Sequence, residues 1–154
     1  MDKLQRTELL DEYYKLAGFV QVYDSYSVTI KTWGVTISAA ALGLGFSKDV
    51  IAQDRQTVIF FIAFVLAVAF WATDTEFKLL QQAHIYRYSA LEKALQEDMY
   101  ITSPSILLTF CEGLKTDDAS HKWISVALWP SVMFPHVVFV ALSAFAIAHK
   151  LCSH

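Results

Sequence analysis

An uncharged run of eighteen residues constrains this chain more than any other feature. It extends from Gln56 to Thr73, reads QTVIFFIAFVLAVAFWAT, and lies between Arg55 and Asp74. At 1.5 Å per helical residue it reaches about 27 Å, close to the thickness of the hydrocarbon core of a bilayer. We therefore expect a membrane-spanning helix over residues 56–74.

The helical pattern continues beyond this run. No Pro or Gly occurs from Gln56 to Met99, and apolar or aromatic residues recur every three or four positions. We expect a cytoplasmic helix over residues 75–99 whose apolar stripe needs a partner in water. That partner is the N-terminal helix, a neighbouring subunit or a soluble cytoplasmic protein. The expected partner or gating surface consists of Phe77, Leu80, His84, Tyr88 and Leu91.

The composition fits a membrane protein. Hydrophobic residues make up 55% of the chain and charged residues 18%, whereas soluble domains carry about 25% charged residues. The apolar excess falls in three blocks, so we expect an all-α integral membrane protein forming one membrane domain over residues 1–154. The formal net charge is −3. There is no basic field for nucleic acid, so no nucleic-acid partner is expected.

The N-terminal segment has its own amphipathic pattern. Over residues 2–24, Leu4, Leu9, Tyr13, Leu16 and Val20 recur near helical spacing among charged residues. Such a helix lies in the lipid headgroup region or packs on the aqueous extension of the second span. We expect packing, because its charged face is acidic as well as basic.

Residues 26–46 form the expected first span, in which Lys31 can reach the interface. Two stripes lie on opposite sides of this helix. The first is a small-residue stripe that allows close helix packing: Gly34, Ser38, Ala41 and Gly45. The second is a stripe rich in hydroxyl groups: Ser25, Thr29, Thr32, Thr36 and Gly43. Both stripes pack inside one protomer, or Thr29, Thr32 and Thr36 line a wet path in an oligomer; both interpretations stay open.

The C-terminal part predicts two more elements. Ser103 and Pro104 open a short helix over residues 104–113. A third span covers residues 123–149, with Pro130 and Pro135 inside it. His136 is the titratable group expected within the membrane. It either hydrogen-bonds a carbonyl freed by one of these prolines, or it has a pH- or ion-linked role.

The distribution of Lys and Arg predicts the topology. With three spans, nine of them lie on the side of the N-terminus and of residues 75–122, and three lie on the other side. The positive-inside rule then places the N-terminus and residues 75–122 in the cytoplasm and the C-terminus outside. Cys111 and Cys152 would lie on opposite sides of the membrane and stay unpaired. Membrane lipid is an expected partner in every case.

No arrangement of side chains predicts catalysis. The chain has no Gly-rich phosphate loop and no GxSxG motif, and its histidines lack metal-ligand spacing. We therefore expect no enzyme activity, no cofactor and no metal site. Asp74 and Glu76, at the exit of the second span, could bind cations or pair with Lys31 or Lys78. We expect both carboxylates to lie in a solvated interface.

The layout resembles a known family. The first span begins KTWGVTISAAALG, and the second leads through FWATDTEFKLLQQAHIYRYSALEKAL into a long amphipathic helix. Over about residues 2–98 this is similar to the SLATT group of small bacterial membrane proteins, which are associated with nucleotide-signalling and antiviral defence systems. The third span has no counterpart in that two-span group. The resemblance implies an effector that assembles in the bacterial inner membrane and perturbs it when triggered.

Three candidate functions remain open, and the first of them is what the resemblance implies. The first is an oligomeric, pore-forming or channel-like effector, probed by ion flux. The second is a non-conducting membrane sensor or anchor that docks a soluble partner through its cytoplasmic helices. The third is an ion-coupled transporter subunit centred on His136. A homo-oligomer is expected under the first two functions, because one 17.4 kDa protomer has little interior to shelter the polar face of its first span.

Overall fold

The structure is a computed structural model that describes residues 3–47, 52–97 and 119–152. These residues form helices and no strands, which confirms the all-helical fold class. The helices are α1 (Lys3–Phe46), α2 (Gln53–Gln96), α4 (Ala119–Ala127) and α5 (Pro130–Cys152). The short helix expected over 104–113 lies outside the described residues.

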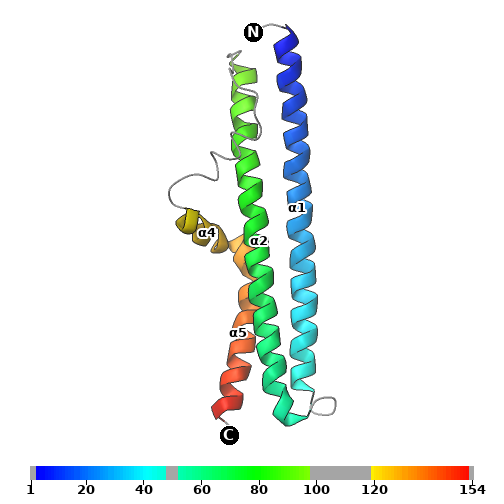
Figure 1. Ribbon diagram of the computed structural model, residues 1–154, viewed down its shortest axis with the longest axis vertical. Helices are drawn as coiled ribbons and strands as arrows, with labels where there is room; N and C mark the ends of the chain where they lie inside the picture. Colours follow the sequence, from blue (N-terminus) through cyan, green and yellow to red (C-terminus); the bar gives the residue numbers. More distant parts are fainter. Residues whose placement is uncertain (1–2, 48–51, 98–118, 153–154) are drawn as a thin grey trace.

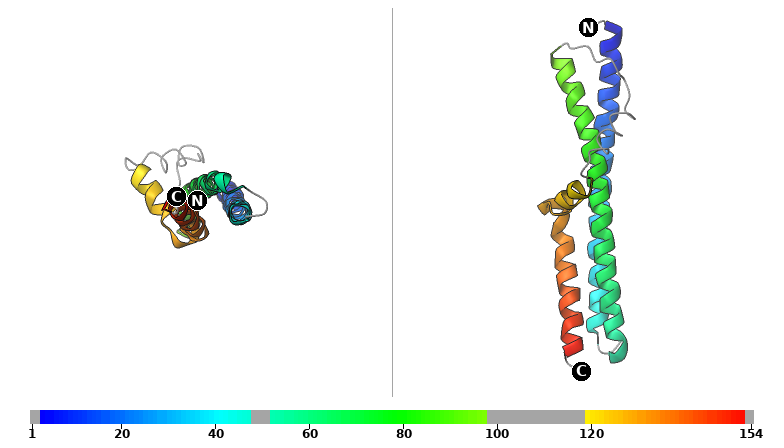
Figure 2. Two further views of the ribbon diagram at one scale, coloured as in Figure 1. Left: turned by 90° about the horizontal axis from the view of Figure 1, so that it is seen from below. Right: turned by 60° about the vertical axis from the view of Figure 1, so that its left-hand side comes forward.

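Helices α1 and α2 run antiparallel, side by side along their whole length (Figures 1 and 2). Each has 44 residues, which corresponds to about 66 Å. Helix α2 is one uninterrupted helix through Asp74, as the absence of Pro and Gly predicts. The apolar run and the charged segment after it therefore form one rigid rod.

Helix α1 is also continuous, which differs from the expected division into a helix over 2–24 and a span over 26–46. The residues at the expected junction do not cap a new helix. Asp24 receives a hydrogen bond from Lys78 on α2, and the carbonyl of Ser25 accepts one from the hydroxyl of Thr29. Because these groups find partners without a turn, the helix passes straight through the junction.

Among the described residues, two helices form the half of the hairpin nearest the N-terminus, and we call residues 6–24 with 75–96 the stalk. Its core is formed by Leu9, Leu16 and Leu91. Beside it, Tyr13 stacks on Tyr88 with ring centroids 4.5 Å apart. The N-terminal part of α1 thus packs on α2, the expected alternative to lying in the headgroups.

Helix α5 joins the hairpin in its other half (Figure 1). We call residues 26–46, 56–74 and 130–152 the three-helix segment. Its core contains Leu42, Phe60, Ala63 and Ala146. Gly45 lies so close to α2 that a Cβ atom there would meet the Phe60 ring at 2.5 to 3.0 Å. Small side chains on α1 therefore set the distance between the helices.

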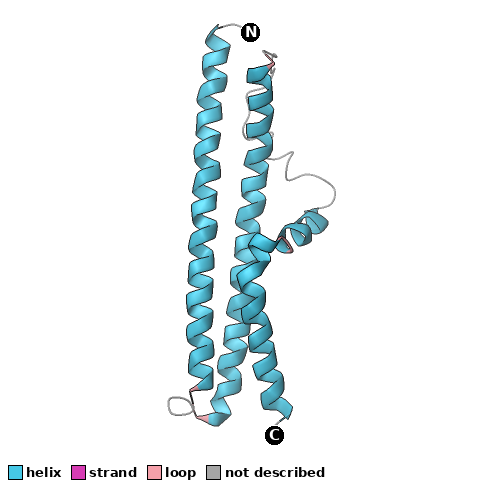
Figure 3. Ribbon diagram, turned by 180° about the vertical axis from the view of Figure 1, so that it is seen from behind, coloured by secondary structure: helices cyan, strands magenta, loops and turns pink. Residues whose placement is uncertain are grey.

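The expected third span over 123–149 is wrong in its boundary. The helix is interrupted at Leu128 and Trp129, so α4 projects to one side of α2 and α5 begins at Pro130 (Figures 1 and 3). Proline suits the first position of a helix, because its missing N–H would have no intrahelical partner there. Phe134 has a non-helical backbone (φ −66°, ψ 110°) because it precedes Pro135.

Two helices, α2 and α5, contain a stretch long and apolar enough to cross a membrane, whereas the expected first span in α1 does not meet this criterion. Only 22% of the apolar stretch is buried inside the protomer in each of these two helices. The core helix of a soluble protein would be mostly buried. The outward side chains include Phe61, Val65, Phe134, Val138 and Phe145. This apolar surface requires lipid or another protein to cover it.

Candidate functional site

A buried carboxylate lies where the stalk meets the three-helix segment. Asp74 on α2 is 0% exposed. Its Oδ1 atom accepts a hydrogen bond of 2.5 Å from the hydroxyl of Ser27 on α1, which is also buried. An ionised carboxylate away from water requires such partners, since its desolvation is costly.

Lys31 supplies the opposite charge. Its Nζ atom lies 3.3 Å from Asp74 Oδ2 and donates a hydrogen bond of 2.9 Å to Ser27 Oγ. Ser27 and Lys31 are four residues apart, so the helical repeat places both on the side of α1 that faces α2. The Lys31 side chain is 22% exposed. It therefore closes the outer side of the cluster.

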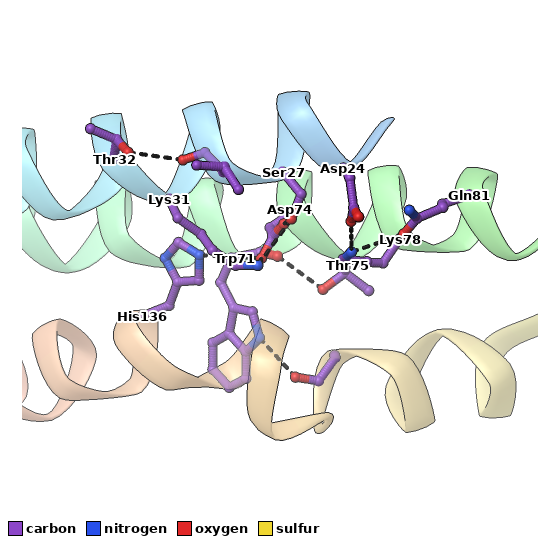
Figure 4. Close-up of polar contacts among 12 residues, drawn as sticks. Asp24, Ser27, Lys31, Thr32, Trp71, Asp74, Thr75, Lys78, Gln81 and His136 are labelled. Atoms are coloured by element: carbon purple, nitrogen blue, oxygen red, sulfur yellow. Dashed lines mark hydrogen bonds and ion pairs between the residues drawn. The ribbon is translucent and has the colours of Figure 1, made fainter. Parts of the chain in front are cut away.

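The third helix contributes His136, which is 1% exposed. Its Nε2 atom lies 3.8 Å from Asp74 Oδ2, which is longer than a hydrogen bond. Figure 4 shows Lys31, Asp74 and His136 converging from three helices. We call Ser27, Lys31, Asp74 and His136 the polar cluster. It joins α1, α2 and α5 at one level of the bundle.

Gly34 makes room for the imidazole. A Cβ atom at this position would lie 3.2 Å from His136 Cε1 and 3.1 Å from Phe70 Cβ. Both distances are shorter than ordinary van der Waals contacts. Gly34 thus has a specific steric role: it lets the His136 ring lie between α1 and α2 on the apolar side of Asp74.

The four tryptophans mark the same level of the molecule. Trp71 donates a hydrogen bond of 3.0 Å to the carbonyl of Ala127, and Trp123 donates one of 2.8 Å to Glu76. Trp33 lies between Lys31 and Gly34, which contact Asp74 and Phe70. Trp129 lies in the two-residue connection between α4 and α5. Tryptophan prefers the boundary between apolar and aqueous surroundings.

The small-residue stripe of α1 faces the inside of the protomer. Gly34, Ser38 and Gly45 are buried, and Ala41 packs at the edge of the core. Their contacts include Phe70 and Phe60 of α2 and His136 of α5. The structure therefore places this stripe in helix contacts within one chain.

The hydroxyl stripe faces outward. Thr29, Thr32 and Thr36 are exposed, and each hydroxyl donates to the backbone carbonyl four residues earlier, at 2.8 to 2.9 Å. The oxygens keep the capacity to accept further hydrogen bonds. The structure does not bring these threonines together with His136, which lies on the opposite side of α1.

The predicted partner surface on the stalk is covered by α1 itself. Leu91 is buried against Leu9 and Leu16. The rings of Phe77 and His84 contact Tyr23, and Tyr88 shares a hydrogen bond of 2.5 Å with Tyr13. Leu80 is half-buried on the same helix, and its carbonyl lies 2.8 Å from His84 Nδ1. Of the expected partners for this stripe, the structure shows the N-terminal helix, because α1 packs along it.

The prediction that Asp74 lies in a solvated interface was wrong, because the carboxylate lies in the protein interior. Its pairing with Lys31, an alternative that the sequence left open, is confirmed. Glu76, two residues later, is exposed as expected. Lys31 begins one antiparallel span and Asp74 ends the next, so both lie at the same end of the helical hairpin. Ser27 lies one helical turn before Lys31 and could have been added to the pair.

The polar cluster offers no chemistry typical of a metal centre. In the part of the chain that the structure describes, no group of three or more His, Cys, Asp or Glu side chains is arranged to hold a metal ion. Lys31 already places a cation beside the one carboxylate.

Comparisons of the chain with protein-family models, curated proteins and solved structures give no match.

Proposed function

We propose that this chain is an integral membrane protein that assembles as a homo-oligomeric effector and opens a pore or otherwise perturbs the bacterial inner membrane. The three-helix segment spans the bilayer, and the stalk extends into the cytoplasm with residues 75–122. The C-terminus lies outside. The layout over about residues 2–98 resembles that of the SLATT group, and this resemblance implies the same kind of effector in antiphage defence.

The exposed apolar surfaces of α2 and α5 support membrane insertion. They end at the level of the polar cluster and of the four tryptophans. Beyond this level, in the stalk, the charged residues of α2 include Glu76, Lys78, Arg87, Glu92 and Lys93. A bilayer boundary at the tryptophans would bury the apolar stretch in lipid and leave these charges in water.

The outward face of α1 is the observation that carries the proposal of an oligomer. Eight exposed residues follow one another at alternating steps of four and three along this face: Gly18, Val22, Ser25, Thr29, Thr32, Thr36, Ala39 and Gly43. We call them the outer seam. This spacing keeps side chains in line toward a neighbouring helix. All eight side chains are small.

The outer seam suits other protein chains better than it suits lipid. Cβ atoms added at Gly18 and Gly43 would meet nothing within 4 Å, so the protomer itself gives no reason for glycine there. Small residues let helices approach closely in lipid, and the threonine oxygens can accept hydrogen bonds from water or a neighbour. We infer that α1 turns this face toward the other copies, with Thr29, Thr32 and Thr36 along a polar path.

Disulfide trapping and ion flux test the proposal together. In a variant without native cysteines, Thr32→Cys should form a disulfide-linked dimer in membranes. Val65→Cys is the matched control, because it is 48% exposed on the apolar face of α2, and it should stay uncrosslinked. In liposomes, the double variant Thr32→Val and Thr36→Val should reduce triggered ion flux several-fold while the oligomer persists.

Two results would contradict different parts of the proposal. Equal crosslinking at Thr32→Cys and Val65→Cys would show that the outer seam is no preferred contact. Oligomers that never conduct under any trigger would favour the non-conducting sensor or anchor. In that case the spans would only hold the stalk at the membrane.

A further inference from the structure

Two buried polar atoms lack a hydrogen-bond partner although they face each other. They are Asp74 Oδ2 and His136 Nε2, both buried and 3.8 Å apart. A buried donor or acceptor without a hydrogen bond is costly, and Asp74 Oδ2 has only its ion pair with Lys31. Two such atoms on helices α2 and α5 point to a species that bridges them.

The charges around this pair decide what that species is. From α1 the charged neighbour is Lys31, 3.3 Å from Asp74 Oδ2, and from α2 it is Asp74 itself. Lys31 and Asp74 together are neutral, so a metal cation would add an uncompensated charge beside an ammonium group. A proton on Nε2 leaves the imidazole neutral and gives Asp74 a donor.

We propose that Asp74 and His136 form a proton-binding site whose occupancy controls how α5 packs on the α1–α2 hairpin. With one ring proton, on Nε2, the imidazole is neutral and directs that N–H toward Asp74 Oδ2, and the polar cluster carries no net charge. A second proton, taken from water, forms an N–H bond at Nδ1. The polar cluster then carries one net positive charge.

The second proton weakens the contact between the helices. A net charge in a water-poor interior is costly unless a counter-charge or water reaches it. Asp74 already compensates Lys31, so hydration is the remaining means of stabilising the imidazolium. The ring is 1% exposed and lies against Gly34, so water enters only if α5 moves outward. Histidine suits this role because its charge ordinarily changes between pH 5 and 8.

The site goes beyond the proposed function, because it exists whether or not the oligomer conducts. Its test is therefore spectroscopic. Nitrogen-15 NMR of the imidazole rings, in the full-length chain in lipid nanodiscs, reports which ring nitrogen carries the proton and at what pH the ring becomes charged. The exposed His149 is the internal reference, and His136→Gln assigns the signal.

Two substitutions should shift this titration in opposite directions. Asp74→Asn removes the counter-charge, so the proton affinity of His136 should fall at least tenfold and the ring should become charged at lower pH. Lys31→Met removes the competing positive charge, so the proton affinity should rise at least tenfold. His149 should be unaffected in both variants, and in the wild-type protein the neutral ring should carry its proton on Nε2.

Three outcomes would overturn the site. They are a neutral ring that carries its proton on Nδ1, an equal titration in all variants, and shifts of the same sign in both variants. If Asp74→Asn fails to fold, Lys31→Met alone must raise the proton affinity. If the oligomer conducts no ions, these spectra should still show the predicted titration of His136. A failure of the proton-binding site is therefore distinguishable from a failure of the proposed pore.

Discussion

The stalk and the three-helix segment use the same two helices but hold them together differently. In the stalk, long side chains reach across the hairpin and pair: Glu12 with Arg87, Tyr13 with Tyr88, and Asp24 with Lys78. In the three-helix segment, glycine and alanine bring the helices close together, and the polar cluster provides the ionic contact. The comparison shows that α1 packs through long paired side chains before Ser27 and through small residues after it.

This difference is expected if water surrounds the stalk and lipid surrounds the three-helix segment. In water, burying leucine and pairing charges stabilises a hairpin against the unfolded chain. In lipid, apolar side chains gain little by leaving the solvent, so close packing of small residues and internal hydrogen bonds contribute more. The change in how α1 packs occurs at the level of the four tryptophans, as expected if the bilayer surface lies there.

Removing the buried ion pair should have the largest effect and should act on the stalk alone. Arg87 donates to both carboxylate oxygens of Glu12, at 3.0 and 3.3 Å, and their side chains are 8% and 11% exposed. Glu12→Ala removes both hydrogen bonds to this charged group and should destabilise the stalk by about 1.5–3 kcal/mol. Hydrogen exchange along residues 7–20 of α1 measures this loss.

The exposed ion pair in the same helix is the control. Lys15 and Asp11 are 63% and 65% exposed, so Lys15→Ala should change stalk stability by no more than about 0.5 kcal/mol. If the two variants have equal effects, the stalk is not held by its buried pair. If Glu12→Ala lowers protection equally in α5, the two regions are not separate.

The next effect should appear in the three-helix segment. Gly45→Ala forces a Cβ atom against the buried Phe60 ring, and overpacking of this kind costs about 1–3 kcal/mol. Val65→Ile is the control, since it adds a methyl group at an exposed position of α2 that lies outside the outer seam. Unfolding in mixed micelles should show loss in the first variant and none in the second. Equal losses would mean that α1 and α2 are not in close contact at this level.

Tyrosine ionisation gives a smaller effect, confined to the stalk. The hydrogen bond with Tyr88 raises the pKa of Tyr13 from 10.0 to about 12. The neutral form is favoured in the folded stalk, so this stabilisation is complete below pH 10 and is lost as the pH rises toward 12. Tyr88→Phe should return the Tyr13 titration toward pH 10, measured by ultraviolet absorbance. Tyr86→Phe, at an exposed position, should leave it unchanged.

The smallest effect should come from the ion pair beside the polar cluster. The hydrogen bond from Lys78 lowers the pKa of Asp24 below its ordinary value of 3.8. The ionised form is favoured by folding, so the stabilisation is present above that ordinary value and is lost as the pH falls through the lowered one. Because Asp24 is 63% exposed, Asp24→Asn should cost under about 1 kcal/mol at pH 7. At low pH the two proteins should converge, and a persistent difference would contradict the pairing.

Much of the fold could be predicted because it depends on local patterns. The continuity of α2 follows from the absence of Pro and Gly, and the apolar stripe at Phe77 to Leu91 required a partner in water. The break before Pro130 was missed because hydropathy alone joined α4 and α5 into one span. Trp129 and Pro130 mark this boundary once the position preferred by proline in a helix is considered.

The polar cluster could not be predicted in full, because its members come from three helices. Asp74 lies 47 residues from Ser27, and its surroundings depend on the register of α1 against α2. The apolar run that ends at Asp74 suggested an exposed boundary. Only the packed hairpin shows that Ser27 and Lys31 cover it and that Gly34 leaves room for His136.

The central claim, that water surrounds the stalk and lipid the three-helix segment, is tested most directly by spin-label accessibility. Nitroxide labels at Val65 and Tyr86, two exposed positions of α2, are compared in liposomes after replacement of the native cysteines. The account predicts that oxygen, which concentrates in lipid, relaxes the label at Val65, and that a water-soluble nickel chelate relaxes the label at Tyr86. Equal access of the nickel chelate to both labels would contradict it.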